Sequence, residues 1–225
     1  MISPYKGNFR VSQSWNNLRS NGTLHQGFDL VGIGDKCLYS PVYGTVVRAG
    51  WENPKNTKQG WGRRVVIRIG KTRLYMYFGH LSSIAVRTGQ AVAPGDLIGI
   101  EGSTGHSTGS HLHWEIRESD RHNLYRDMPQ YSSIPNEASR TAKQSSWDGK
   151  LLGTATLFAG RNGYPASIYN SILQARLSAL GFDAGDPDGL FGNKTTQAVK
   201  QFQLSRSLEA DGRVGAKTKA QLFAL

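Results

Sequence analysis

The sequence predicts two domains, a mainly antiparallel β domain followed by a small domain of three helices. Three observations support this fold class. Short alternating segments separated by turn signals fill residues 40 to 117, a polar stretch covers 132 to 150, and from about residue 164 apolar residues recur at helical spacing. The boundaries that we expect are 1–135 for the first domain, 136–160 for a linker and 161–225 for the second domain.

The expected strands of the first domain are short and have no long helical pattern between them. Residues 64 to 69 alternate, with Val65, Ile67 and Ile69 on one face, and residues 74 to 78 continue this alternation. Further strands are expected over 42–48, 97–100 and 111–117, with turns at Gly70-Lys71, Thr88-Gly89 and Pro94-Gly95. Short successive strands without crossover helices favour an antiparallel sheet.

An internal repeat marks the turns of the second domain. The segment Asp188–Thr195 matches Asp211–Thr218, because Asp, Gly, Gly, Lys and Thr recur at an offset of 23 residues. Asp-Gly forms a tight turn, and the second Gly admits the chain into a helix. With the helical spacing over 168–179, the repeat predicts three helices whose repeated Asp and Gly form turns rather than contact a ligand.

Composition and charge limit the class of protein. The net charge of +11 indicates an anionic partner or surface, yet no nucleic-acid-binding signature accompanies it. No stretch approaches the ~20 apolar residues that a membrane span needs. We therefore expect no specific nucleic-acid partner and no membrane insertion. Cys37 is the only cysteine, so no internal disulfide can form, and we interpret it as a packing residue.

Two pairs of residues point to a metal site. His25 and Asp29 are four residues apart and His111 and His113 two apart, so each pair lies on one side of an extended strand. Imidazole and carboxylate are ligands that suit zinc, and three such groups leave the open fourth position of a catalytic zinc. These residues alone do not tell which of His111 and His113 is the ligand.

The first domain resembles the lysostaphin-like (LytM-type) zinc metalloendopeptidases. The matching segments are His25–Leu30, Pro41–Val47, Phe78–Leu81 and the long Gly102–Glu115. In the last of these, Ser110 stands where the family usually has proline, which we expect to alter only the loop entry.

The resemblance assigns roles to five residues. It makes His25, Asp29 and His113 the zinc ligands, and His80 and His111 the catalytic histidines that do not bind the metal. No His-Glu-x-x-His motif supplies a glutamate base, so an imidazole, with a usual pKa near ~6.5, takes that role. We expect His80 and His111 to share water activation, oxyanion stabilisation and protonation of the leaving amine.

Other candidate residues are interpreted more simply. Glu115 shares the strand face of His111 and His113, where it either holds a histidine tautomer or forms a surface ion pair. We expect His106 at the rim of the site and His122 in an exposed polar stretch. The glycine-rich loop 102–110 lacks the Gly-Lys-Ser/Thr ending of a phosphate-binding loop.

The second domain resembles the peptidoglycan-binding domain type 1 family over about residues 165 to 225. The resemblance rests on Leu173–Leu177, on both Asp-Gly-x-x-Gly-x-Lys-Thr copies and on Ala198–Gln203. It implies a module without catalytic activity that docks on the glycan or stem peptide of the cell wall.

Together these resemblances imply a zinc-dependent peptidoglycan endopeptidase that cuts stem-peptide or cross-bridge bonds. We expect a D-Ala–diamino acid bond rather than Gly-Gly, because this type of binding domain is not specific to glycine-bridged walls. The expected partners are bacterial peptidoglycan and anionic wall polymers, and the protein is expected to be a monomer. The alternatives are a degenerate wall-binding protein or amidase activator, and a basic nucleic-acid-binding protein.

The start of the chain bears on localisation. Residues 1 to 6 lack the apolar region of a secretory signal, and the chain can form no internal disulfide. These features predict a phage endolysin that is held in the host cytoplasm until lysis and then acts on the cell wall. A mature secreted autolysin is the alternative.

Overall fold

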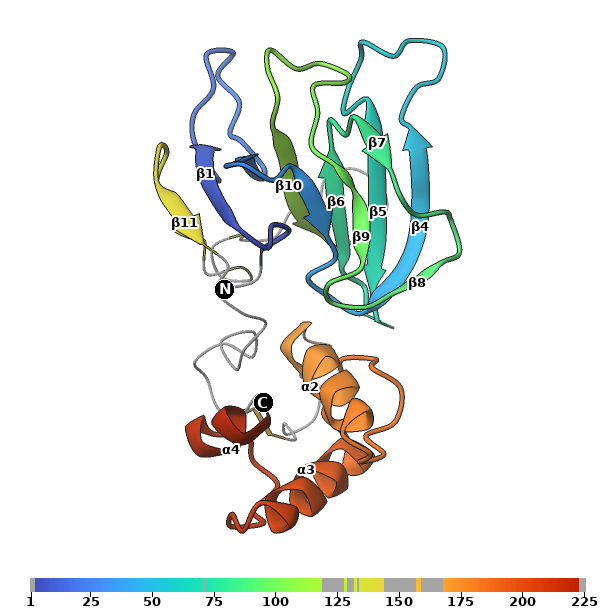
Figure 1. Cartoon of the computed structure of the whole chain (residues 1–225), viewed down its shortest axis with the longest axis vertical. Coiled ribbons are helices and arrows are strands. Elements are labelled where there is room, and N and C mark those ends of the chain that lie inside the picture. The colour runs from blue at the N-terminus through green and yellow to red at the C-terminus, as the bar shows by residue number, and fades with distance from the viewer. Residues whose placement is uncertain are drawn as a thin grey trace. The chain divides into compact units, whose positions relative to one another are not determined.

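The computed structural model divides the chain into two compact units (Figure 1). Residues 1–68 and 73–146 form the first unit, and the second consists chiefly of residues 147–225. The first unit is mainly antiparallel sheet and the second carries three helices, which confirms the predicted fold class. The structure describes residues 3–70, 72–118, 128, 132, 134–143, 157–158 and 168–222.

The first unit is built on an eight-stranded sheet with the order β11-β1-β2-β10-β6-β5-β4-β8. A smaller sheet has the order β3-β9-β7. The bounds of the larger sheet's strands are β1 (Asn8–Gln13), β2 (Phe28–Gly32), β4 (Gly44–Trp51), β5 (Arg63–Ile69), β6 (Tyr75–Gly79), β8 (Ala91–Val92), β10 (Leu112–Arg117) and β11 (Thr141–Lys143). Those of the smaller sheet are β3 (Cys37–Tyr39), β7 (Ser83–Ile84) and β9 (Leu97–Ile100).

In β5, Val65, Ile67 and Ile69 are fully buried on one face, but Val66 on the other face is fully buried as well, so burial does not alternate strictly along this strand. Each expected strand is present, and its ends differ from the expected ones by no more than three residues. Two described segments of the expected linker 136–160 pair with residues outside it. Its β11 pairs with β1, which would otherwise be an open sheet edge, and Leu157 forms a bridge with Val214.

Strand β10 is the central element of the site, because it lies between β2 and β6. All six of its residues are buried. Trp114 and Leu112 lie in the core, while His113 and Glu115 occupy the opposite face. Three loops extend from one end of this sheet, and they join β1 to β2, β4 to β5 and β9 to β10 (Figure 1).

The second unit contains α2 (Ile168–Ala179), α3 (Asn193–Ser205) and α4 (Ala216–Leu222). Each Asp-Gly turn before α3 and α4 is closed by a glutamine side chain. Gln174 donates to Asp188 at 2.8 Å, and Gln203 donates to Asp211 at 2.8 Å. Since these aspartates bond within their own turns, the structure supports their role as turn formers. None of the described helices is both long and apolar enough for a membrane span.

Candidate active site

Three polar side chains converge at the junction of β2 and β10. Asp29 and His113 are partners in the register of the two strands, and His25 lies just before β2. The Nδ1 atom of His113 lies 2.8 Å from Oδ1 of Asp29, and Nε2 of His25 lies 3.1 Å from each of these two atoms. The predicted His-His-Asp cluster therefore forms from these three residues.

The spacing of the three atoms fits a zinc ion. Zinc binds nitrogen and carboxylate oxygen at about 2.1 Å, so two ligands of a tetrahedral zinc lie about 3.4 Å apart. The observed separations of 2.8 to 3.1 Å are only slightly shorter. Two imidazoles and a carboxylate are also the donor types that zinc accepts. Residues His25, Asp29 and His113 therefore match zinc in both spacing and chemistry.

The second nitrogen of each clustered histidine is fixed by a hydrogen bond. Nδ1 of His25 donates to the carbonyl of Ser14 at 2.9 Å, and Nε2 of His113 lies 3.2 Å from Glu115. These contacts determine which nitrogen faces the cluster. Glu115 is buried and also pairs with Arg117, so it holds the histidine and is not part of a surface ion pair.

The electrostatics of the cluster favour positive charge at its centre. Burial alone would lower the pKa of His113, but its hydrogen bonds to Asp29 and Glu115 raise the pKa to about 9. Burial alone would raise the pKa of Asp29, but the hydrogen bonds from His113 and His25 bring that pKa well below its usual value. Because the same carboxylates attract a proton and a metal cation, binding of the cation would displace the proton.

The two remaining predicted histidines lie beside this cluster. The ring centroids of His80 and His111 are 4.6 Å apart, and Nε2 of His111 lies 3.9 Å from Oδ2 of Asp29. Nδ1 of His80 donates to the carbonyl of Thr104 at 2.8 Å, and Nδ1 of His111 donates to the carbonyl of Gly109 at 2.8 Å. In the neutral rings, Nε2 is therefore left as a proton acceptor.

His80 has a special backbone conformation and a shifted pKa. Its φ of +63° lies in the left-handed region, which non-glycine residues rarely adopt. Burial lowers its pKa to about 4, with further lowering from His111 and His113. The ring is therefore neutral near pH 7.

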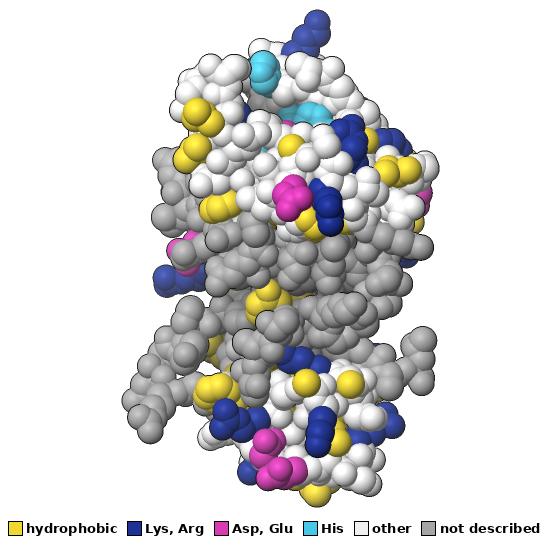
Figure 2. Space-filling model, turned by 90° about the vertical axis from the view of Figure 1, so that its left-hand side faces the viewer, with side chains coloured by type: hydrophobic (Ala, Val, Ile, Leu, Met, Phe, Trp, Pro, Cys, Tyr) yellow, Lys and Arg dark blue, Asp and Glu magenta, His cyan; other side chains and the backbone are white. Residues whose placement is uncertain are grey.

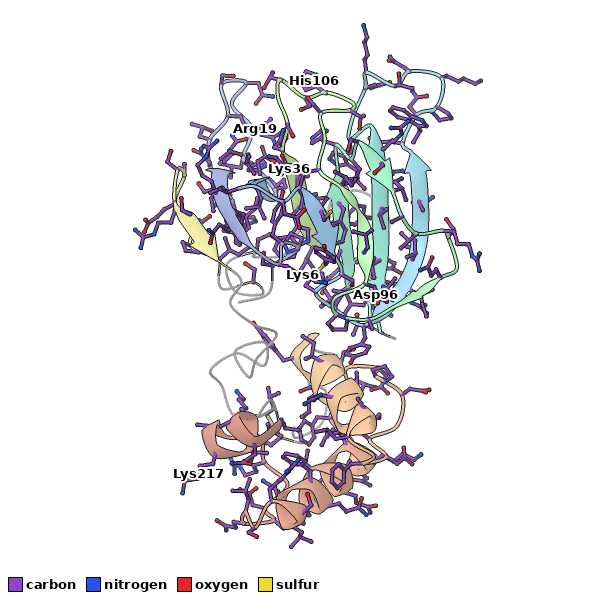
Figure 3. The ribbon with its side chains drawn as sticks, in the orientation of Figure 1. Lys6, Arg19, Lys36, Asp96, His106 and Lys217 are labelled. Atoms are coloured by element: carbon purple, nitrogen blue, oxygen red, sulfur yellow. The ribbon has the colours of Figure 1, made fainter. Side chains whose placement is uncertain are left out.

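A groove of about 850 Å³ is lined by Asp29 and His113 of the cluster and by both additional histidines. The groove is lined by residues from the β1–β2, β4–β5 and β9–β10 loops, among them Arg19, Trp61 and His106. Arg19 and His106 lie at the loop end of the sheet (Figure 3), and histidine side chains reach the surface there (Figure 2). His106 is exposed, as expected for a residue at the rim. His122 lies outside the described residues.

Sequence reasoning missed several parts of the site. The ring of Trp61 stacks on His113 with centroids 6.2 Å apart, and the carbonyls of Thr104 and Gly109 orient the other histidines. The effect of Ser110 was expected at the loop entry. Its hydroxyl donates to the buried carboxylate of Glu101 at 2.7 Å, a contact that forms only in the folded chain.

Comparisons with known proteins agree with this geometry. Residues 23–124 match the model of peptidase family M23, and residues 171–222 match that of a peptidoglycan binding domain. The first unit is thus similar to M23 peptidases, and the second to peptidoglycan binding domains. The chain contains an M23 peptidase domain followed by a peptidoglycan-binding domain.

Three relatives illustrate the match. The chain is 36% identical over 104 residues to the peptidoglycan DD-endopeptidase ShyA of Vibrio cholerae, covering 44% of this chain and 24% of that protein. It is 35% identical over 98 residues to lysostaphin of Staphylococcus simulans, covering 42% and 18%. It is 35% identical over 108 residues to the L-Ala–D-Glu endopeptidase of Bacillus subtilis, covering 46% and 31%. The chain thus spans less than a third of each relative's length.

Proposed function

We propose that the protein is a zinc-dependent peptidoglycan endopeptidase that hydrolyses a peptide bond of the bacterial cell wall. The observation that carries this proposal is the convergence of His25, Asp29 and His113 at an open groove that Asp29 and His113 line, with two further imidazoles beside them. The M23 match over the same residues and the wall-hydrolysing relatives support it.

His25, Asp29 and His113 would hold the metal through Nε2, Oδ1 and Nδ1. Zinc would there supply a Lewis acid that polarises the scissile carbonyl and lowers the pKa of a water molecule. Glu115 and the carbonyl of Ser14 keep the two histidines in the required tautomers, because each bonds the ring nitrogen that faces away from the cluster.

His80 and His111 would carry the proton transfers. Their Nε2 atoms are acceptors, since each Nδ1 donates to a backbone carbonyl. One ring takes a proton from the attacking water, whose oxygen bonds to the carbonyl carbon. The protonated imidazole can stabilise the oxyanion and then gives its proton to the amine as the C–N bond breaks. The products are a carboxylate and an amine.

The groove favours a bond in the stem peptide over a glycine bridge. Stem peptides carry free carboxylates, glycine bridges have none along their length, and the guanidinium of Arg19 lines the groove. Two of the relatives, a DD-endopeptidase and an L-Ala–D-Glu endopeptidase, are also named for stem-peptide bonds. We infer that the cleaved bond joins D-Ala to a diamino acid.

Digestion of purified walls of known cross-link type tests this function. Mass spectrometry should find fragments with a new free amine on the diamino acid from walls that lack glycine bridges. The His111→Ala variant should keep the metal and lose at least about a hundredfold in turnover, whereas His113→Ala should lose both metal and turnover. Full activity of His113→Ala without metal, or cleavage of glycan bonds alone, would contradict the proposal.

One further variant and two binding measurements separate the alternatives. Deleting residues 161–225 should weaken wall binding while hydrolysis of short soluble peptides continues. A degenerate wall-binding protein would bind zinc and walls yet release no fragments. A basic nucleic-acid-binding protein would bind DNA in a salt-sensitive manner and would not bind walls.

A further inference from the structure

The carboxylate of Glu101, directly after β9, is buried and accepts four hydrogen bonds. The hydroxyl of Tyr5 and the amide of Gly32 donate to Oε2 at 2.6 and 2.7 Å. The Lys36 ammonium and the Ser110 hydroxyl donate to Oε1 at 2.8 and 2.7 Å. None of these residues takes part in the proposed reaction, so the buried charge needs another explanation.

Glu101 is an ionised acceptor at neutral pH. Burial alone would raise its pKa, but the hydrogen bonds from Gly32, Lys36 and Tyr5, together with that from Ser110, lower it. An ionised carboxylate makes stronger hydrogen bonds than a neutral acceptor does. The bond to Ser110 is therefore a firm attachment point for the exposed loop that contains this serine.

Ser110 lies where this loop returns to the sheet. The amide of His111 donates to the carbonyl of Gly102 at 2.9 Å, which closes the two ends of the 102–110 loop. Glu101 directly precedes Gly102, and Ser110 directly precedes His111. The hydrogen bond between the side chains of Glu101 and Ser110 therefore joins the two ends of the loop beside the backbone hydrogen bond. The Glu101–Ser110 contact is thus a second tie, made by side chains, across the base of the loop.

The loop orients the ring of His111 through its last carbonyl. Gly109 accepts the hydrogen bond from Nδ1 of His111, and Gly109 is bonded directly to Ser110. Packing does not hold the Gly109 carbonyl in place, because residues 108 to 110 are exposed and a side chain built on Gly109 would meet nothing within 4 Å. Hydrogen bonds must therefore fix the carbonyl. The Ser107 hydroxyl donates to it directly at 2.8 Å, and the Ser110 hydroxyl ties the adjoining residue to Glu101 at 2.7 Å.

We propose that Glu101, acting through Ser110, is a positioning residue that holds the carbonyl of Gly109 against His111 and so keeps Nε2 of that ring as the proton acceptor. This proposal rests on the proposed catalytic role of His111. The contact does not involve His25, Asp29 or His113, so its loss should leave the bound metal in place.

The decisive comparison is between Ser110→Ala and Ser110→Thr. The alanine variant removes the hydroxyl and should lower kcat by about tenfold, with KM and metal content nearly unchanged. Its thermal midpoint should also fall, because the buried carboxylate loses one of its four hydrogen bonds. The threonine variant keeps the hydroxyl and should retain most of kcat. Equal kcat for wild type and Ser110→Ala would overturn the proposal.

A matched control removes the other donor to the same oxygen. Lys36→Gln leaves the Ser110 hydrogen bond intact and should reduce stability without lowering kcat, since the Lys36 side chain is 37% exposed and far along the chain from the loop. If Lys36→Gln lowers kcat as much as Ser110→Ala does, the hydrogen bonds to Glu101 affect kcat through stability alone and the positioning role is wrong. The double variant Glu101→Gln with Ser110→Ala should have the same kcat as a folded Glu101→Gln variant alone, because both changes break the same contact.

Ring nitrogen NMR separates this proposal from the proposed function. In the wild type, the ¹⁵N shifts of His111 should report a proton on Nδ1, and in Ser110→Ala a mixture of tautomers. This readout does not depend on hydrolysis, so it tests positioning even if no wall is cleaved. An unchanged tautomer in Ser110→Ala would count against the proposal, and absent wild-type hydrolysis would count only against the proposed function.

Discussion

The carboxylate of Glu115 lies 3.2 Å from Nε2 of His113, on the side of the ring opposite to the nitrogen that faces Asp29. Glu115 is 1% exposed and His113 is 5% exposed, so this contact is shielded from water. A carboxylate on the second ring nitrogen fixes the orientation of the ring and makes the other nitrogen a better metal ligand. Glu115 thereby supports the proposed metal site without supplying a ligand atom.

Substituting Glu115 by glutamine should weaken zinc binding by about 10- to 100-fold, because the neutral amide no longer polarises the His113 ring. Competition with a chromophoric chelator measures this change directly. The exposed Glu137 provides a control, since Glu137→Gln should leave zinc affinity unchanged. A zinc affinity for Glu115→Gln equal to that of the wild type would show that Glu115 only pairs with Arg117.

The left-handed backbone of His80 allows its chemistry to be separated from its conformation. Asparagine tolerates a φ near the observed +63°, whereas alanine is strained there by about 1 to 2 kcal/mol. Both His80→Asn and His80→Ala should lower kcat, but only the alanine variant should also lose this stability. Urea unfolding followed by tryptophan fluorescence is suitable, because Trp15, Trp51, Trp61 and Trp114 all lie in the first unit. Equal stability of the two variants would contradict the argument from strain.

The metal-site residues could be predicted because their positions follow from strand geometry and local motifs. The period of two placed His111 and His113 on one face of a strand, and in the structure both line the groove. The division between ligand and non-ligand came from the family resemblance, since alternation treats the two residues alike. In the structure, the register of β2 and β10 places His113, and not His111, opposite Asp29.

Contacts between distant side chains could not be predicted in this way. Gln174 precedes its turn Asp188 by 14 residues, whereas Gln203 precedes Asp211 by 8, so the repeated glutamine contact has no fixed spacing. Glu101 is likewise reached from Tyr5, Gly32, Lys36 and Ser110 only after the sheets have formed. Such contacts depend on tertiary packing and leave no periodic signal in the sequence.

The buried Glu101 gives the first unit a definite pH dependence. Its pKa is lowered from the usual 4.5 in the folded state, so on acidification the unfolded chain takes up this proton first. The stability that Glu101 contributes should be complete above pH 4.5 and be lost as the pH falls through its lower, folded value. Glu101→Gln should therefore cost about 2 to 3 kcal/mol at pH 7 and progressively less below pH 4.5. A difference in unfolding free energy that stays constant down to pH 3 would be evidence against an ionised Glu101.

Arg19 provides a test of substrate choice that is independent of the metal. Its guanidinium lines the groove, so it should recognise a free carboxylate on the stem peptide. Arg19→Gln should lower kcat/KM by about tenfold for a soluble stem peptide with that carboxylate free. For the same peptide with the carboxylate amidated, the kcat/KM values of wild type and Arg19→Gln should agree within about twofold, since the uncharged amide does not form an ion pair with Arg19.

Two controls make the Arg19 test specific. Arg19→Lys keeps the charge but not the paired donors of the guanidinium, so its kcat/KM for the free carboxylate should fall between those of wild type and Arg19→Gln. Arg10 lies on β1 outside the groove, and Arg10→Gln removes the same charge from the chain at a distance. If Arg10→Gln and Arg19→Gln reduce kcat/KM equally, the effect comes from overall charge. If Arg19→Gln impairs the free and amidated peptides to the same degree, Arg19 does not bind the carboxylate.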